Sequence, residues 1–174
     1  MSDGDEWWDI VDAGGTPTGA VFRRGAPQWP AGGFHLIAAV CVQREDGTVL
    51  LTRRAAGKEF AFGWEFPGGS ALAGESSRNA ASRELREETG LDAEPSGLEL
   101  IGRFTETSAL LDFYVARAGP ALEVTLQASE VMAAEWVAPE EVVRRLAAGA
   151  MAAPWAARLN CLWPSIRHAL TRTP

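Results

Sequence analysis

The residues that could do chemistry are concentrated between Gly69 and Leu91, where acidic side chains recur at helical spacing. Glu84, Glu87 and Glu88 stand at positions i, i+3 and i+4, which places three carboxylates on one face of a helix. Like charges at this spacing repel one another, so an ordinary helix gains no stability from them. Hard divalent cations favour such a cluster, because they prefer oxygen ligands. The spacing therefore predicts a metal site, and the alternative is a solvated acidic helix face.

The sequence around these glutamates carries the signals of a loop followed by a helix. Gly74 ends a loop of small residues, and Ser76 or Ser77 can cap the first turn of a helix. No proline or glycine follows until Gly90, which suits the residue just after a helix end. The pattern predicts a helix that presents the three carboxylates along its length.

Strands must position this helix, and the chain contains several candidates. Residues 7–24 read as an N-terminal β-hairpin, with a Gly-Gly-Thr-Pro turn between two strands. Residues 34–42 are a nearly continuous apolar run, as expected of a central strand buried on both faces. Further strands are expected at 48–54, 64–66, 98–106, 109–116, 123–126 and 134–137.

Two helices are expected after the last strand. Pro139 suits the first position of a helix that runs to about residue 148. Residues 153–170 have helical apolar spacing, and Pro164 is expected to kink or split that helix. Mixed strands with helices on both sides predict an α/β fold, namely an α/β/α sandwich with a mixed sheet. No repeat or linker is visible, so residues 1–174 are predicted to form one domain with a core at 34–148.

Composition narrows the classes of function. With 174 residues, 47% of them apolar, the chain can bury a real core. A net charge of −7 argues against nonspecific binding to nucleic acid or to an anionic membrane. Only Cys41 and Cys161 are present, far apart, so a reducing cytoplasm is expected rather than a disulfide framework. No signal peptide is visible, and the apolar stretches are too short to span a bilayer.

Residues 69–91 resemble the signature of the Nudix hydrolase family, G-x5-E-x7-R-E-U-x-E-E-x-G-U, where U is aliphatic. The fixed positions fall on Gly69, Glu75, Arg83, Glu84, Leu85, Glu87, Glu88, Gly90 and Leu91. A match at every fixed position is far more specific than a short motif. Residues 64–69 also resemble the usual approach to this signature. Residues 12–19 and 33–36 resemble a subgroup related to isopentenyl-diphosphate isomerase, which carries an N-terminal hairpin before the Nudix core.

The resemblance implies an activity and roles for the residues. Nudix hydrolases cleave a diphosphate linkage in a nucleoside diphosphate joined to another moiety, and divalent ions bridge that diphosphate to carboxylates. By resemblance, Glu87 and Glu88 ligate Mg²⁺ or Mn²⁺ and the Gly68 carbonyl completes the site. Glu84 is implied to be the general base or a further ligand, oriented by Arg83.

Other residues of the predicted site have two readings each. Glu75 is either a ligand or a partner of the helix N-terminus. Glu130, on a later loop, stands where the family often supplies a further ligand or base. The cations Arg53, Arg54 and Lys58 could hold phosphates or merely solvate a strand end. The expected partner is a small nucleoside diphosphate derivative, and a homodimer through the hairpin is possible.

Two rival functions follow from the same residues. The isomerase uses a Cys-Gly-His stretch before its glutamates, but the matching positions here read Gly68-Gly69-Ser70. Proton addition and removal on an isoprenoid therefore lacks its thiol and imidazole. A non-catalytic module that senses a nucleotide has no need of all three glutamates. Turnover with Mg²⁺ separates such a module from a hydrolase.

Overall fold

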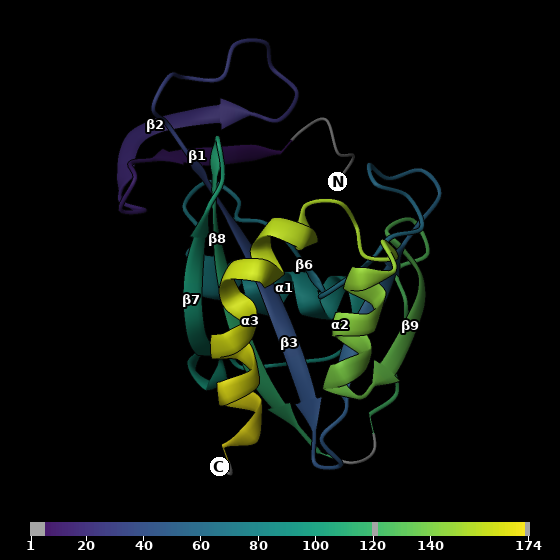
Figure 1. The fold of residues 1–174 in the computed structure, drawn as a ribbon. Coiled ribbons are helices and arrows are strands. Elements are labelled where there is room, and N and C mark those ends of the chain that lie inside the picture. The colour runs from purple at the N-terminus through teal and green to yellow at the C-terminus, as the bar shows by residue number, and fades with distance from the viewer. Residues whose placement is uncertain (1–5, 120–121, 173–174) are drawn as a thin grey trace.

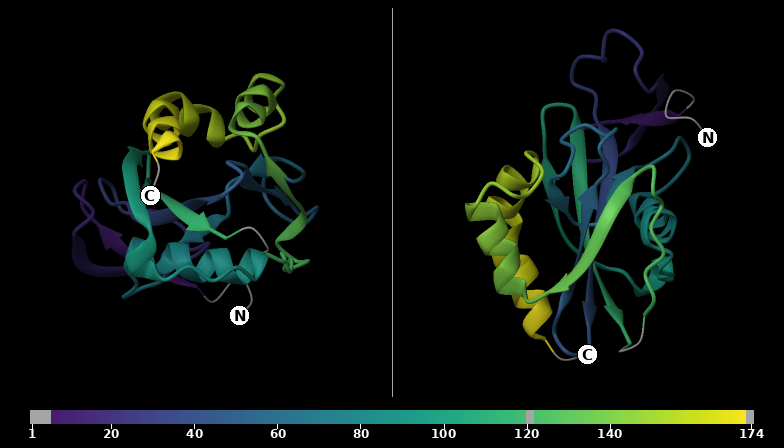
Figure 2. Two further views of the ribbon diagram at one scale, coloured as in Figure 1. Left: turned by 90° about the horizontal axis from the view of Figure 1, so that it is seen from below. Right: turned by 90° about the vertical axis from the view of Figure 1, so that its right-hand side faces the viewer.

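A mixed β-sheet forms the middle layer of the molecule, with helices on both faces (Figure 1). The computed structural model describes residues 6–119 and 122–172. Helix α1 (Ser77–Thr89) covers one face of the sheet, while α2 (Pro139–Ala147) and α3 (Trp155–Thr171) cover the other (Figure 2). This arrangement confirms the predicted α/β/α sandwich.

The centre of the sheet is a parallel pair of long strands. β3 (His35–Arg44) runs beside β8 (Ala109–Ala118), with His35 opposite Ala109 and Arg44 opposite Ala118. All other pairs in the sheet of the described chain are antiparallel. β8 pairs with β7, β3 with β6 and β4, and β4 with β5 and β9. These strands are β4 (Val49–Arg54), β5 (Trp64–Glu65), β6 (Gly68–Ser70), β7 (Glu99–Thr105) and β9 (Val131–Val137), and a 3-10 turn, η1 (Pro95–Gly97), precedes β7.

The apolar run in β3 is buried on both sides because the strand separates two cores. Alternate side chains of a strand point to opposite faces. Ala38 and Val40 pack in the cluster that contains the buried face of α1. Ala39 and Cys41 pack in the cluster that contains α2 and α3. A continuous apolar sequence is therefore required at this position, as the sequence predicted.

The predicted N-terminal hairpin is present. β1 (Trp7–Val11) and β2 (Pro17–Arg23) form a separate two-stranded antiparallel sheet. Asp12 holds the turn, since its Oδ1 accepts hydrogen bonds from the backbone N–H groups of Gly14 and Thr16. Reciprocal backbone bonds between Val11 and Phe34, at 2.8 and 3.0 Å, attach the hairpin to the chain just before β3. The hairpin consequently sits at the end of the sheet where β3 and β8 begin (Figure 1).

One predicted strand is absent, and of the two outcomes expected at Pro164, a kink or a split, the split is wrong. Residues 123–126, which the structure describes, form no edge strand. The segment lies against the end of α1, where Thr125 N–H donates to Thr89 O at 2.8 Å and so satisfies a free helix carbonyl. Pro164 does not split α3, which continues to Thr171. Pro164 and the Asn160 carbonyl that loses its donor are on the exposed side, so water can solvate that carbonyl.

None of the helices in the described parts of the chain is both long and apolar enough to cross a membrane.

Candidate active site

The three clustered glutamates lie on α1, and the helix ends where the sequence predicted. Ser76 is the N-cap, and its side chain accepts a hydrogen bond from Asn79 N–H at 3.2 Å. Gly90 follows the last turn with φ of 71°, a left-handed conformation that glycine adopts without strain. The caps fix the start and end of the helix, and hence the level at which each carboxylate stands.

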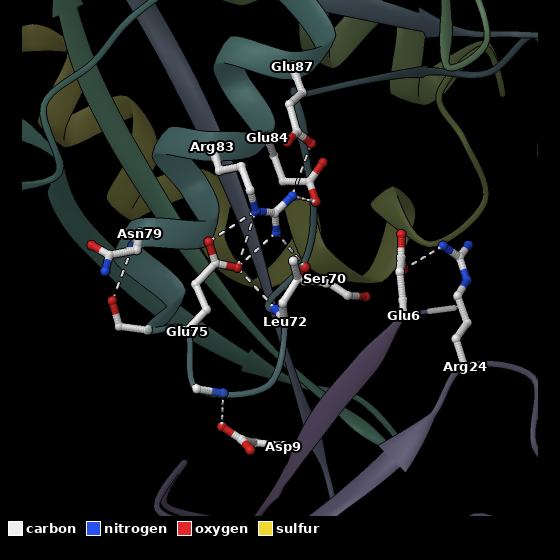
Figure 3. A network of polar contacts seen from close by, with 12 residues as sticks. Glu6, Asp9, Arg24, Ser70, Leu72, Glu75, Asn79, Arg83, Glu84 and Glu87 are labelled. Atoms are coloured by element: carbon white, nitrogen blue, oxygen red, sulfur yellow. Dashed lines mark hydrogen bonds and ion pairs between the residues drawn. The ribbon is translucent and has the colours of Figure 1, made fainter. Parts of the chain in front are cut away.

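Arg83 ties the acidic face of α1 to the loop before it (Figure 3). Its Nη1 donates to Glu84 at 2.8 Å and to Glu87 at 3.1 Å. Its Nε and Nη2 bind Glu75, and Nη2 also donates to the Ser70 carbonyl at 3.1 Å. A planar guanidinium with five donors suits this set of contacts, and the ion pairs compensate part of the repulsion between carboxylates.

Glu75 holds the loop rather than the helix N-terminus. Its Oε2 accepts from Leu72 N–H at 3.0 Å as well as from Arg83. The loop is also tied to the N-terminal hairpin, since Asp9 accepts from Gly74 N–H at 2.7 Å. The hairpin and α1 therefore brace the same short loop from two sides.

Glu88 is the most buried of the three clustered glutamates, with 6% of the residue exposed. Its Oε2 accepts a hydrogen bond from Gly68 N–H at 3.2 Å, which brings β6 against α1. Burial, together with the charges of Glu65 and Glu84, raises the pKa of Glu88 well above its ordinary value. Glu65 is itself buried and is paired with Arg54 at 2.7 Å.

Glu84 occupies an intermediate environment. Burial raises the pKa of its carboxyl to about 7, although Arg83 acts in the opposite direction. Glu87 is more exposed, with 47% of its side chain accessible. The helix face thus presents one buried, one half-buried and one exposed carboxylate.

These residues line a cavity of about 640 Å³. Its lining comes from the acidic face of α1 with β6, from the hairpin and the start of β3, from residues 54–60 and 127–130, and from the N-terminal part of α3. The candidates from the sequence that line the cavity are Arg54, Lys58, Gly68, Arg83, Glu84, Glu87, Glu88 and Glu130.

Three of the candidates have contacts that the sequence did not suggest. Lys58 and Glu130, one proposed for phosphate and the other for metal, form an ion pair at 2.6 Å. Arg53 is not among the described residues that line the cavity. Its Nε donates to the Phe62 carbonyl at 2.9 Å, and its guanidinium lies near the rings of Phe62 and Trp64.

The oxygen atoms at this site are of the kind that a hard divalent cation prefers as ligands. Glu84, Glu87 and Glu88 supply carboxylate oxygens, and Gly68 lies beside Glu88. Burial, and after it the charges of Glu65 and Glu84, raises the pKa of Glu88, and a bound cation would favour its ionised form. In residues 6–119 and 122–172 no three acidic, histidine or cysteine side chains converge closely enough to ligate an ion as they stand. Arg83 draws Glu84 and Glu87 toward itself, so side-chain rotation is needed for ligation.

Several cavity residues were missed from the sequence. Glu6 and Arg24 of the hairpin region pair at 2.9 Å beside the Arg83 network (Figure 3). Trp8 stacks on His35 with ring centroids 4.3 Å apart. Arg158, on α3, also lines the cavity. No motif marks these positions, because they depend on how the hairpin and α3 fold over the sheet.

The fold and the site together define a hydrolase of the Nudix family, and the chain belongs to that family: the NUDIX domain model matches residues 33–159. An uncharacterised Nudix hydrolase of Listeria monocytogenes is 33% identical over 79% of this chain and 82% of its own. A CTP pyrophosphohydrolase of Escherichia coli is 38% identical over 62% of this chain and 78% of its own.

Among solved structures, DR0079 from Deinococcus radiodurans has a TM-score of 0.70 at 22% identity, covering 84% of this chain and 92% of that one. That likeness supports the fold. Nudix hydrolases generally depend on a divalent metal ion and act on small nucleotide derivatives. The more specific subgroup suggested by residues 12–19 and 33–36 stays a prediction.

Proposed function

We propose that this protein hydrolyses the diphosphate linkage of a nucleoside diphosphate joined to another moiety, with Mg²⁺ or Mn²⁺ held on the acidic face of α1. The observation that carries the proposal is the set of three glutamates around Arg83, facing a cavity that also contains cationic side chains. The carboxylates can bind a divalent ion that bridges them to a polyanionic substrate. The cationic side chains in the same cavity can contact that substrate directly.

Each candidate residue has a role in this proposal. Glu87 and Glu88, with the Gly68 carbonyl, would hold the ion, and Glu130 could add a ligand once it leaves Lys58. Bound there, the ion would neutralise the diphosphate and acidify a water molecule. Glu84 would accept the proton of the attacking water or add a ligand, and a pKa near 7 suits proton transfer at neutral pH.

The remaining cationic side chains would position Glu84 and the phosphates of the substrate. Arg83 would orient Glu84, as its 2.8 Å hydrogen bond allows. Arg54, at the end of β4, and Lys58, in the loop between β4 and β5, would contact phosphates. Arg53 donates a hydrogen bond to the Phe62 carbonyl, so it would contact a phosphate only if this bond breaks. The whole chain would work as one domain, in the cytoplasm, where free Cys41 and Cys161 suit a reducing medium. A homodimer through the hairpin is part of the same proposal.

A substrate panel with metal and chelator arms tests the proposal. The panel contains nucleoside triphosphates, nucleotide sugars, dinucleotides and ADP-ribose, and CTP is the first choice because of the Escherichia coli relative. Release of phosphate products is measured with added Mg²⁺ or Mn²⁺. Hydrolysis should require the metal and stop in excess EDTA. Full turnover in EDTA, or no turnover of any member by a protein that binds nucleotide, would contradict it; the second result would favour a sensing module.

The isomerase alternative has its own readout. Isopentenyl diphosphate and Mg²⁺ are incubated with the protein, and dimethylallyl diphosphate is measured. We expect none, because Gly68 and Ser70 stand where thiol and imidazole groups are needed. Product formation well above that of Glu87→Gln would replace the hydrolase assignment.

A further inference from the structure

The part of the cavity lining that belongs to α3 contains a buried arginine that the proposed chemistry does not use. Arg158 lies on α3, only 9% of the residue is exposed, and it lines the cavity. An arginine is costly to bury unless its donors find acceptors. What Arg158 binds is therefore informative.

The contacts of the Arg158 guanidinium leave its terminal nitrogens without an acceptor. Nε donates to Glu106 Oε1 at 2.6 Å, and the guanidinium carbon lies 5.2 Å from the centre of the Trp155 ring. Within the described chain, neither Nη1 nor Nη2 makes a hydrogen bond. Trp155 is 2% exposed and cannot move freely, so the ring and Glu106 fix the orientation of the guanidinium. A fixed pair of parallel N–H donors matches a phosphate or carboxylate in bidentate geometry.

The charges nearby favour a ligand group that is itself anionic. The Glu106 carboxylate pairs with Arg158 only through Nε. A quarter of the Glu106 side chain is exposed to solvent. Glu65, which also lies within the electrostatic range of Arg158, is already paired with Arg54 at 2.7 Å. His35, which also lines the cavity, is stacked on Trp8, and burial lowers its pKa, so it adds little charge. The Nη donors are thus open to an additional negative group in the cavity.

We propose that Arg158 binds an anionic group on the moiety beyond the scissile diphosphate, so that the enzyme prefers substrates in which that moiety is a phosphate rather than a neutral sugar. This inference rests on the proposed function, since it assigns the second end of the same substrate. The metal site takes the diphosphate at the α1 wall, and Arg158 takes the terminal phosphate at the α3 wall. Nucleoside triphosphates satisfy both ends.

The first test compares two substrates with the same base. KM and kcat are measured for a nucleoside triphosphate and for the matching nucleoside diphosphate-glucose, using the base that the substrate panel ranks first. Arg158→Gln should raise KM for the triphosphate roughly 10- to 100-fold, the range expected for lost charge-assisted hydrogen bonds. KM for the glucose conjugate should change less than about threefold, because its terminal group is neutral. Arg158→Lys should lie between, since it keeps the charge and loses the fork.

Arg167→Gln is the matched control, because Arg167 is exposed on the same helix. Arg167→Gln should leave KM and kcat unchanged for both substrates. An equal loss with both substrates in Arg158→Gln, or a wild-type preference for the glucose conjugate, would overturn the inference and leave Arg158 a purely structural partner of Glu106.

A binding measurement does not depend on turnover. Inorganic triphosphate is titrated into chelator-treated protein by calorimetry, after circular dichroism has shown that each variant is folded. Wild-type and Arg167→Gln proteins should bind it, and Arg158→Gln should bind at least about tenfold more weakly. Equal binding by all three proteins, or no binding by the wild type, would contradict the inference. Failure of the whole substrate panel would instead count against the proposed function.

Discussion

Gly69 and Glu84 are in direct contact: a β-carbon on residue 69 would lie 2.5 Å from Glu84 Oε1. The backbone of β6 therefore forms the surface against which this carboxylate rests. The requirement for glycine at this position is steric, and it connects the first fixed residue of the signature with the candidate base.

Gly69→Ala should consequently move the Glu84 carboxylate without unfolding the protein. The side-chain end can rotate away, so the free energy of unfolding should change by less than about 1 kcal/mol. A displacement of the reacting group by about 1 Å can cost up to 100-fold in rate. We expect kcat to fall roughly 10- to 100-fold while KM changes little. Gly97→Ala, where nothing lies within 4 Å of the added carbon, is the control. Unchanged kcat would show that the exact place of Glu84 does not matter.

Glu88→Gln should separate activity from stability. The amide can still accept the hydrogen bond from Gly68 N–H, but it removes a buried charge that lies close to Glu65 and Glu84. In metal-free protein at pH 8 the midpoint of urea unfolding should stay level or rise. Activity should fall by roughly 100-fold or more, because a charged ligand is lost. Glu45→Gln, in the exposed turn after β3, should leave both properties unchanged. Wild-type turnover of Glu88→Gln at limiting metal would remove Glu88 from the ligand set.

Arg83→Lys should show that the shape of the guanidinium matters as well as its charge. A lysine cannot bind Glu75, Glu84 and Glu87 and also reach the Ser70 carbonyl. We expect kcat to fall roughly 10- to 100-fold, as for other lost orienting partners, with a small drop in Tm. The comparison is Arg86→Lys, an exposed position on the same helix. If both variants retain wild-type kcat, Arg83 serves the fold alone.

Stability of the metal-free protein should depend on pH through Glu84. Its pKa in the folded protein is about 7, above its ordinary value of 4.5, so the folded state holds the proton more tightly than the unfolded state. The stabilisation is complete below pH 4.5 and is lost as the pH rises through 7. Glu84→Gln should remove this pH dependence, making the difference between wild type and variant change by roughly 1–3 kcal/mol between pH 4.5 and 8.

Chemical unfolding in EDTA at several pH values measures this difference. Wild type must be compared with Glu84→Gln because other groups also make stability depend on pH. Glu65 and Glu88 act in the same direction as Glu84, and His35 acts in the opposite direction. Added Mg²⁺ should raise Tm more at pH 8 than at pH 5, since protons compete with the ion. A wild-type-minus-variant difference that does not vary with pH would contradict the environment assigned to Glu84.

The sequence predicted the parts of the site that depend on local chemistry. The capping serine, the glycine after the helix and the i, i+3, i+4 glutamates all specify α1 through contacts within a few residues. The same holds for the hairpin, whose turn is held by Asp12. Local signals of this kind can be read before any tertiary structure is known.

Contacts between distant segments could not be read in this way. Lys58 lies in the loop after β4 and Glu130 lies just before β9, and these two strands are paired, so the two side chains meet. Considered alone, Lys58 was expected to hold phosphate and Glu130 a metal ion. Arg158 belongs to an amphipathic pattern in which nothing distinguishes a cavity residue from a surface one. Their roles depend on which strands pair and on where α3 crosses the sheet.

The parallel pair of β3 and β8 has a consequence for how the chain reaches its native state. β3 is complete early in the sequence, but β4, β5, β6, α1 and β7 intervene before its long partner appears. Closing so large a loop costs entropy before any ladder bond repays it, and topologies with such distant pairings fold on the millisecond-to-second scale. Until then the apolar edge of β3 is open to strands of other molecules, which makes the partly folded chain prone to aggregate. Recovery of the protein in recombinant expression should therefore respond to synthesis rate and temperature more strongly than its final stability would indicate.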